Sequence, residues 1–100
     1  MSTQVIRHIV VRGRVQGVGY RAFVEHEALK RGIQGWVRNR RDDTVEAVFA
    51  GALEKVEAIT EACRKGPSGA LVDALDQHDG VEDDLVLRRP GELFSVLATV

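Results

Sequence analysis

The sequence predicts an α+β fold in which two helices cover one face of a mainly antiparallel sheet. Two observations carry this prediction: short runs rich in β-branched residues alternate with two longer segments whose apolar residues recur at helical spacing, and glycine or polar turns separate them. The 100 residues, of which 44% are apolar, are enough for one domain, residues 1–100, with a single two-layer core.

The first strand and the first helix are expected at residues 4–12 and 21–31. The strand is short and β-branched, and His8 is expected on a sheet face and not as a ligand. Gly32 stands where a left-handed residue would end the helix. The apolar residues at helical spacing in this segment are Phe23, Val24, Ala28 and Leu29.

Two further strands are expected at residues 33–39 and 44–50, joined by a hairpin turn at residues 40–43. A positive φ at Asp43 would cost about 1 kcal/mol, which Asp tolerates better than most residues. The adjacent carboxylates of Asp42 and Asp43 might suggest an acid/base pair, but turn chemistry explains them more simply.

The second helix is expected at residues 52–65, where an apolar stripe ends before Gly66 and Pro67. The stripe is formed by Leu53, Val56, Ile59 and Cys63. Cys63 would then lie in the core as a small hydrophobe and not as a nucleophile. Because it is the single cysteine, it forms no internal disulfide.

The last third of the chain predicts two strands, at about residues 70–75 and 94–100. The acidic stretch between them, residues 76–84, is expected to be an exposed loop. The resulting order, βαββαβ with a further strand to add at one edge, is the ferredoxin-like split βαβ sandwich.

A glycine-spaced turn leads from the first strand into the first helix and has the character of an anion cradle. Its glycines permit a positive φ, so successive N–H groups can converge on one point beside a helix N-terminus. Arg21 can add a planar fork of donors. The spacing matches neither the Walker pattern nor a complete G-x-G-x-x-G motif, so glycines that serve only the turn, with a solvated Arg21, are an alternative. The segment reads Gly13-Arg14-Val15-Gln16-Gly17-Val18-Gly19-Tyr20-Arg21-Ala22-Phe23.

Charge and composition narrow the classes of function. Residues 1–50 carry nine Lys/Arg against five Asp/Glu, a local +4, so the field should draw a small anion toward the cradle. Arg40 and Arg41 are expected to be solvated. The chain has only five aromatic residues and a net charge of −1, which argues against a function in binding nucleic acid. No membrane helix and no secretory segment are seen, which makes a cytoplasmic location the expectation.

A second segment strengthens the case for phosphate chemistry. It reads Gly35-Trp36-Val37-Arg38-Asn39-Arg40-Arg41-Asp42-Asp43-Thr44-Val45-Glu46. Together with the cradle it resembles the two signatures of the acylphosphatase family, and the resemblance covers about residues 5–75. The family usually has Asp-Gly where this chain has Asp42-Asp43.

The resemblance implies a metal-independent, cofactor-free hydrolase of small acyl phosphates. A monomer is expected. Arg21 and the backbone amides of residues 14–20 would hold the phosphoryl oxygens, while Asn39 would orient the attacking water. A phosphate oxygen would take the proton in place of a protein base. The phosphate-binding residues implied in this way are Arg14, Val15, Gln16, Gly17, Val18, Gly19, Tyr20 and Arg21.

The residues themselves are consistent with this chemistry. The turn after the first strand and the end of the second strand can approach the same sheet edge, which would bring Asn39 beside Arg21. No Ser-His or Cys-His pair and no metal-ligand cluster accompanies them, so the substrate must already carry a good leaving group. The backbone N–H of Gln16, and not its side chain, is expected at the substrate, and Tyr20 is expected to pack.

Three readings stay open beside the simple hydrolase. The same fold serves RNA-binding modules, and a phosphate-binding domain without turnover would keep the cradle. A domain acting on carbamoyl phosphate is a related variant. Two side chains of the second segment are assessed in the same way. Trp36 is expected to pack and not to act in catalysis, whereas Glu46 either steadies a nearby arginine or is solvated.

Overall fold

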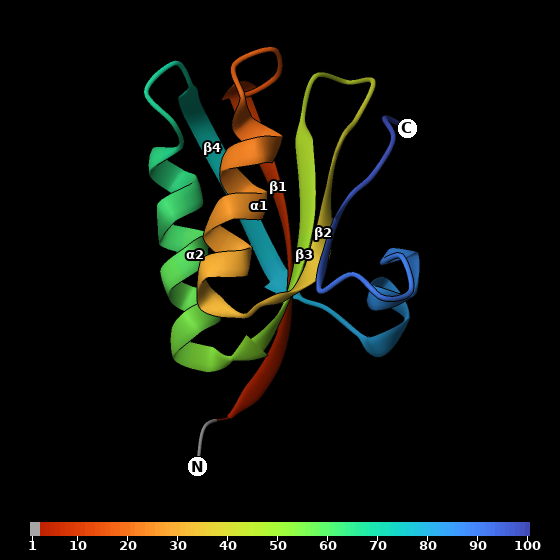
Figure 1. Ribbon diagram of the computed structural model, residues 1–100. Helices are drawn as coiled ribbons and strands as arrows, with labels where there is room; N and C mark the ends of the chain where they lie inside the picture. The colour runs from red at the N-terminus through yellow and green to blue at the C-terminus, as the bar shows by residue number, and fades with distance from the viewer. Residues whose placement is uncertain (1–2) are drawn as a thin grey trace.

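The computed structural model describes residues 3–100 and has a five-stranded sheet with two helices on one face (Figure 1). The helices are α1 (Tyr20–Arg31) and α2 (Leu53–Lys65), and a 3₁₀ helix, η1 (Glu82–Leu87), lies in the C-terminal part. The strands are β1 (Gln4–Arg14), β2 (Gln34–Asn39), β3 (Val45–Ala52), β4 (Leu71–Asp79) and β5 (Phe94–Val96). This arrangement confirms the predicted ferredoxin-like α+β fold.

The sheet order, β4-β1-β3-β2-β5, explains how the site is assembled. β3 is antiparallel to both β1 and β2. β1 and β2 therefore run in the same direction, and their C-terminal ends lie at the same end of the sheet. Val11 and Asn39 both pair with Val45, from opposite sides. The end of β2 therefore lies only two strand spacings, about 10 Å, from β1 just before the glycine turn.

The core lies between the sheet and the two helices. Alternate residues of β1 and β3, such as Ile9 and Phe49, are fully buried against the helical layer. Cys63 of α2 belongs to this core, and burial raises the pKa of its thiol to about 12. The prediction that Cys63 packs as a small hydrophobe is confirmed.

One of the apolar residues predicted to face the core from α1 is exposed in the structure. Val24 and Ala28 are fully buried as expected, but Leu29 is 51% exposed because its position on the helix turns it away from the sheet. Glu27 is buried instead, and its carboxylate pairs with Arg31 Nη1 at 2.6 Å. The predicted left-handed helix end is confirmed at Gly32, with φ 66°.

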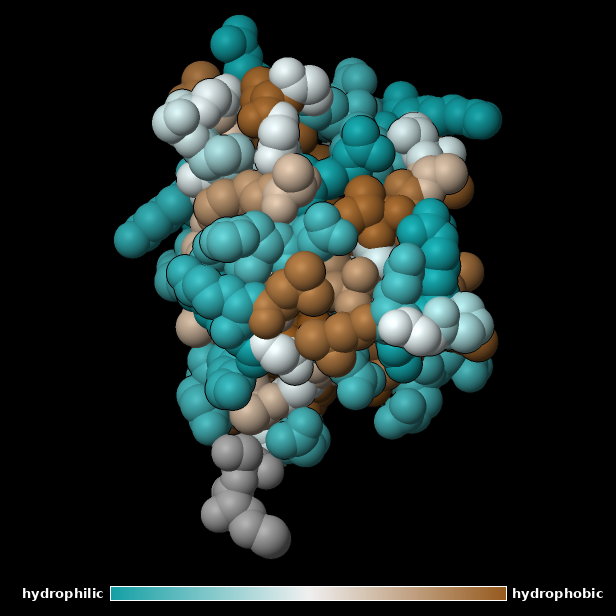
Figure 2. Space-filling view, in the orientation of Figure 1, coloured by the Kyte–Doolittle hydropathy of each residue, from teal (hydrophilic) through white to brown (hydrophobic). Residues whose placement is uncertain are grey.

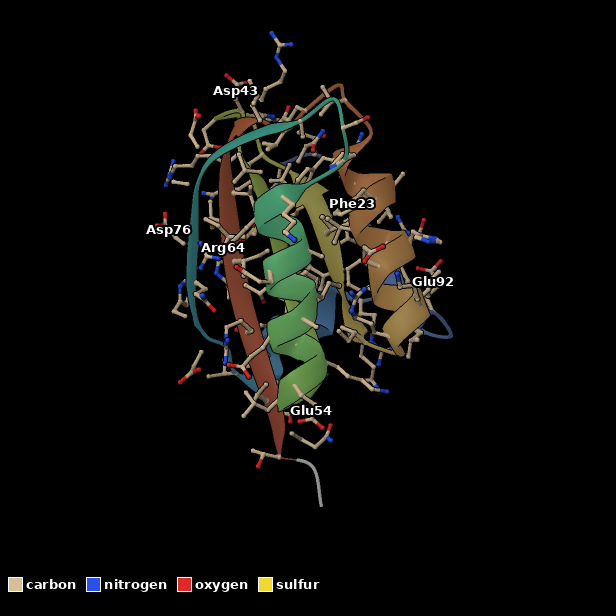
Figure 3. The ribbon with its side chains drawn as sticks, turned by 90° about the vertical axis from the view of Figure 1, so that its left-hand side faces the viewer. Phe23, Asp43, Glu54, Arg64, Asp76 and Glu92 are labelled. Atoms are coloured by element: carbon tan, nitrogen blue, oxygen red, sulfur yellow. The ribbon has the colours of Figure 1, made fainter. Side chains whose placement is uncertain are left out.

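The acidic stretch at residues 76–84 is not a loop throughout, contrary to the prediction. β4 continues to Asp79 as an edge strand, and its pairing with β1 reaches Arg7 opposite Asp79. Backbone hydrogen bonds hold this edge while the side chains, such as that of Asp76 in Figure 3, stay exposed. Hydrophobic patterning therefore could not reveal it.

The C-terminal part also differs from the predicted strand at residues 94–100. β5 is parallel to β2 and has three residues, after which the chain follows β2 without being a regular strand. Leu97 N still donates to Val37 O at 2.9 Å. Before β5, η1 contacts β2 on the side away from the helices, where Trp36 Nε1 donates to Asp84 O at 2.6 Å (Figure 1).

The visible surface is mostly polar, with separate apolar patches (Figure 2). The two long helices have 12 and 13 residues, and no helix within residues 3–100 combines the length and the hydropathy needed to cross a bilayer.

Candidate active site

The turn between β1 and α1 is shaped by glycines. Gly17 and Gly19 have φ values of 73° and 79°, and Gly19 is the N-cap of α1. Gly13, at a bulge in β1, approaches β4 so closely that a Cβ there would lie 2.2 Å from Leu71 O. These positions need glycine for different reasons: two of them bend the loop and the third lets two backbones meet.

The amides of this turn are free to bind a ligand. Within residues 3–100, none of the N–H groups of residues 15–19 donates to a backbone or side-chain acceptor. The next turn begins only where Phe23 N donates to Gly19 O at 3.0 Å. A run of unpaired donors at a helix N-terminus favours an anion.

A pocket of about 430 Å³ lies at this turn and brings Arg21 and Asn39 together. The predicted site residues that line it are Val15, Gly17, Gly19, Tyr20, Arg21 and Asn39. Arg14, Gln16 and Val18 do not line it.

Asn39 ends β2 and is 9% exposed. Its Oδ1 has no hydrogen-bond partner within residues 3–100, although the atom is buried. Buried polar side-chain atoms are nearly always paired, with protein or with water. The unpaired amide oxygen at the pocket therefore indicates a position for a water molecule or a ligand donor.

Gln16 connects the turn to the β2–β3 hairpin. Its Nε2 donates to Arg40 O and to Thr44 O, both at 2.8 Å. The side chain thus joins the glycine turn to the segment that begins directly after Asn39. Sequence reasoning placed Gln16 in the cradle but did not reveal this tie, because the acceptors are carbonyl groups far along the chain.

The hairpin itself confirms the turn chemistry expected for its two aspartates. Asp43 has φ 72° and is the one non-glycine residue with a positive φ among residues 3–100. Asp42 Oδ1 accepts hydrogen bonds from Thr44 Oγ1 at 2.6 Å and Thr44 N at 3.1 Å. These two bonds, the side-chain one first, lower the pKa of Asp42.

Tyr20 packs, as predicted. It is 1% exposed, and its hydroxyl donates to Cys63 O at 2.6 Å, which joins α1 to α2. Burial raises the pKa of this phenol, so it stays protonated at neutral pH. Trp36 is also buried, at 2% exposure, with the Arg38 guanidinium 4.7 Å from its ring centre.

Glu46 steadies an arginine, which was one of its two predicted roles. Its carboxylate accepts from Arg38 Nε at 2.8 Å and contacts His8 Nε2 at 2.7 Å. Burial raises the pKa of Glu46, but the hydrogen bonds from His8 and Arg38 outweigh burial and hold it below its ordinary value. His8 lies on a sheet face, as expected, 4.6 Å from the ring of His78.

The charged side chains that line the pocket are those of Arg21 and Glu25. Within residues 3–100, Arg21 forms no ion pair, and no group of three His, Cys, Asp or Glu residues is arranged to hold a metal. Sequence reasoning missed three lining residues: Ala22, Glu25 and Val96. Glu25 could have been found because it follows Arg21 by four residues on the same helix face.

Comparisons with known proteins show the family of the chain. The sequence model of the acylphosphatase family matches residues 7–85. An acylphosphatase of Rhodopseudomonas palustris (strain BisB18) is 59% identical over the whole of both chains. The structure of an acylphosphatase from Bacillus subtilis has a TM-score of 0.80 at 33% identity, covering 95% of this chain and 99% of that one.

An acylphosphatase structure from Coxiella burnetii gives a TM-score of 0.81 at 29% identity and covers 94% of this chain and 93% of the other. Both the sequence and the fold therefore match over nearly the full length of the relatives. The chain belongs to the acylphosphatase family.

Proposed function

We propose that this chain hydrolyses small acyl phosphates at the pocket formed by the glycine turn, Arg21 and Asn39. The bond between the carboxyl oxygen and phosphorus breaks, and the products are a carboxylate and inorganic phosphate. The observation that carries the proposal is that amides, an arginine and an amide oxygen with no partner among residues 3–100 line or border one pocket. Family membership supports the same reaction.

The phosphoryl group is held by the backbone amides of residues 14–20 and by Arg21. Each hydrogen bond to a charged oxygen contributes roughly 1.5–3 kcal/mol. Because the donors are fixed by the glycine turn and by α1, they need little rearrangement as charge spreads over the phosphoryl oxygens in the transition state.

The attacking water is oriented by Asn39. Its Oδ1 accepts one proton of the water in a hydrogen bond, so a lone pair of the water oxygen faces phosphorus. As the new P–O bond forms, the acyl carboxylate leaves with the electrons of the old one, and a phosphoryl oxygen takes the water proton. No side chain needs to change its protonation state.

A site that binds the phosphoryl group and orients a water molecule, without a nucleophilic side chain, suits a substrate with a good leaving group. Tyr20 and Cys63 are buried, and the pKa of each is raised, so neither offers a nucleophile at neutral pH. Catalysis then rests on positioning and charge stabilisation, which are sufficient for phosphoryl transfer to water when a carboxylate departs.

The test is release of phosphate from acetyl phosphate by the wild type and by Arg21→Ala and Asn39→Ala, with a chelator present. We expect each substitution to lower kcat/KM by about 10²–10³-fold or more, since a preorganised donor or water ligand is lost. Arg64→Ala is the matched control, because Arg64 lies on α2 and pairs with Glu61 at 3.5 Å.

Circular dichroism and thermal unfolding show whether each variant is folded. A folded Arg21→Ala or Asn39→Ala that keeps wild-type turnover would refute the role given to that side chain. Nucleoside triphosphates and phosphate monoesters serve as control substrates. Salt-sensitive binding of single-stranded RNA without hydrolysis of acetyl phosphate would contradict the proposal as a whole.

We further propose that the enzyme acts as a one-domain monomer in the cytoplasm. One chain supplies every residue named in the pocket, and a single buried cysteine suits a reducing compartment. Light scattering during size-exclusion chromatography gives the oligomeric state. Cell fractionation gives the compartment.

A further inference from the structure

We propose that Glu25 selects the acyl group by charge, so that acyl phosphates with a neutral or cationic acyl part are preferred over those carrying a carboxylate. This inference rests on the proposed function, because it concerns the other half of the same substrate. It names a determinant on the acyl side of a site whose phosphate side is built from backbone amides.

The proposed reaction divides the residues that line the pocket into two sets. Gly17, Gly19, Arg21 and Asn39 belong to the phosphate end, because the proposed function assigns the phosphoryl group and the attacking water to this part of the lining. Of the other lining residues, Val15 and Tyr20 are 1% exposed, which leaves the side chains of Ala22, Glu25 and Val96 for the acyl end. An acyl group joined to a phosphate in the cradle must therefore leave past two small apolar side chains and one carboxylate.

No partner in the described part of the chain neutralises the charge of Glu25. Residues four apart on a helix are neighbours, so Glu25 stands one turn along α1 from Arg21. Within residues 3–100, Glu25 takes part in no ion pair and no side-chain hydrogen bond, whereas the other glutamate of α1 in this region, Glu27, pairs with Arg31 and Lys30.

A bound phosphate sharpens this difference. The phosphoryl oxygens take up the donors of Arg21 and of the turn, so the carboxylate of Glu25 becomes the unpaired charge that faces the acyl group. At a partly exposed position, one such charge changes the binding of a second charge by about three- to tenfold, and salt weakens the effect. Ala22 and Val96 contact a neutral group without any charge preference.

The experiment compares three substrates of matched shape: benzoyl phosphate, 4-carboxybenzoyl phosphate and 4-(aminomethyl)benzoyl phosphate. For each enzyme, kcat/KM on each charged substrate is divided by kcat/KM on benzoyl phosphate. Comparing these ratios between wild type and Glu25→Gln cancels the intrinsic reactivity of the substrates. We expect the carboxylate ratio to rise and the ammonium ratio to fall, each by about three- to tenfold.

Two further variants make the result decisive. Glu25→Lys should reverse the preference, and Glu57→Gln, which removes the same charge from an exposed position on α2, should leave both ratios unchanged. Unchanged ratios in folded Glu25→Gln and Glu25→Lys would overturn the inference. An equal change on all three substrates would also overturn it, because Glu25 would then act through Arg21 and not on the acyl group.

Failure of the proposed function gives a different result. A wild type that hydrolyses none of the three substrates contradicts the reaction itself, and the inference falls with it. A wild type that hydrolyses all three, with ratios that Glu25 does not control, leaves the reaction standing and removes only the inference. Repeating the measurement at high salt should move both wild-type ratios toward those of Glu25→Gln, which means a higher carboxylate ratio and a lower ammonium ratio.

Discussion

Individual glycines are needed in this molecule for one of two reasons: a positive φ in the backbone, or a lack of space for a Cβ atom. Gly17 has φ 73° with open space where a Cβ would lie, whereas a Cβ on Gly35 would lie 1.8 Å from Val48 O. We expect Gly17→Ala to lower the free energy of unfolding by only about 1 kcal/mol but to cut kcat/KM at least tenfold, because the amides are redirected. Gly35→Ala should lower the free energy of unfolding by about 3 kcal/mol or more, because the new Cβ overlaps the backbone of β3.

Urea unfolding and the acetyl phosphate assay separate the two cases. The ratio of activity loss to stability loss should be large for Gly17→Ala and small for Gly35→Ala. Full activity in Gly17→Ala would show that the path of the loop backbone does not set the geometry of the phosphate end.

Asp43 is the one residue other than glycine with a positive φ among residues 3–100. With φ 72° it carries the strain of a left-handed side chain at the tip of the hairpin, which Figure 3 labels. Asp43→Gly should raise the free energy of unfolding by about 0.5–1 kcal/mol, as the relief of strain exceeds the added entropy of the unfolded chain. Asp42→Gly, its neighbour, should lower it, because both bonds to Thr44 are lost.

The midpoint of urea unfolding measures both changes in stability, provided that the dependence of the unfolding free energy on urea concentration, m, stays the same. A lower midpoint for Asp43→Gly would mean that the Asp43 side chain contributes more than its backbone strain costs.

At the scale of elements, the tie between the glycine turn and the hairpin holds the two halves of the site together. Gln16→Ala removes the two hydrogen bonds to Arg40 O and Thr44 O. We expect a loss of about 1–2 kcal/mol in stability and a fall of about tenfold in kcat, since Asn39 and the cradle are no longer held in register. The exposed Gln34 provides the control, Gln34→Ala. Activity that survives undiminished would show that sheet pairing alone positions Asn39.

The elements also show how far sequence reasoning reaches. Both helices and the first three strands were predicted within one or two residues, because their apolar faces follow helical or alternating periods. β4 was predicted too short because the side chains of its second half face solvent, while backbone hydrogen bonds to β1 hold the strand as far as Asp79. η1 was not predicted, as no apolar stripe marks its six residues.

The site divides in the same way. Arg21 and Asn39 were named from local motifs, and the sheet register brings both to one pocket. Gln16 was predicted to act through its backbone, but its side-chain acceptors depend on where the hairpin folds back, which no local pattern encodes. Glu25 was overlooked because a lone glutamate on a helix is usually a solvated residue.

At the scale of the whole molecule, stability should depend on acid through carboxyls that are held by partners. The pKa values of Glu27, Asp42, Glu46 and Glu92 are all lowered in the fold. A lowered pKa adds stability that is fully present above the unfolded value, about 4.5 for Glu, and is lost as the pH falls through the folded-state value. The free energy of unfolding should thus be level near neutrality and fall below about pH 4.5.

Glu46 gives the sharpest test of this linkage, since it joins three strands through His8 and Arg38. Glu46→Gln should lower the free energy of unfolding by about 2 kcal/mol at pH 7, because two charge-assisted hydrogen bonds are weakened. The difference from wild type should shrink as the pH falls below about 4.5, where the unfolded wild-type chain begins to bind a proton at this carboxyl and the folded chain, with its lowered pKa, does not yet do so. Urea unfolding at a series of pH values measures the difference, and Glu57→Gln controls for the loss of one negative charge. A gap that stays constant or widens in acid would show that Glu46 contributes packing and not charge.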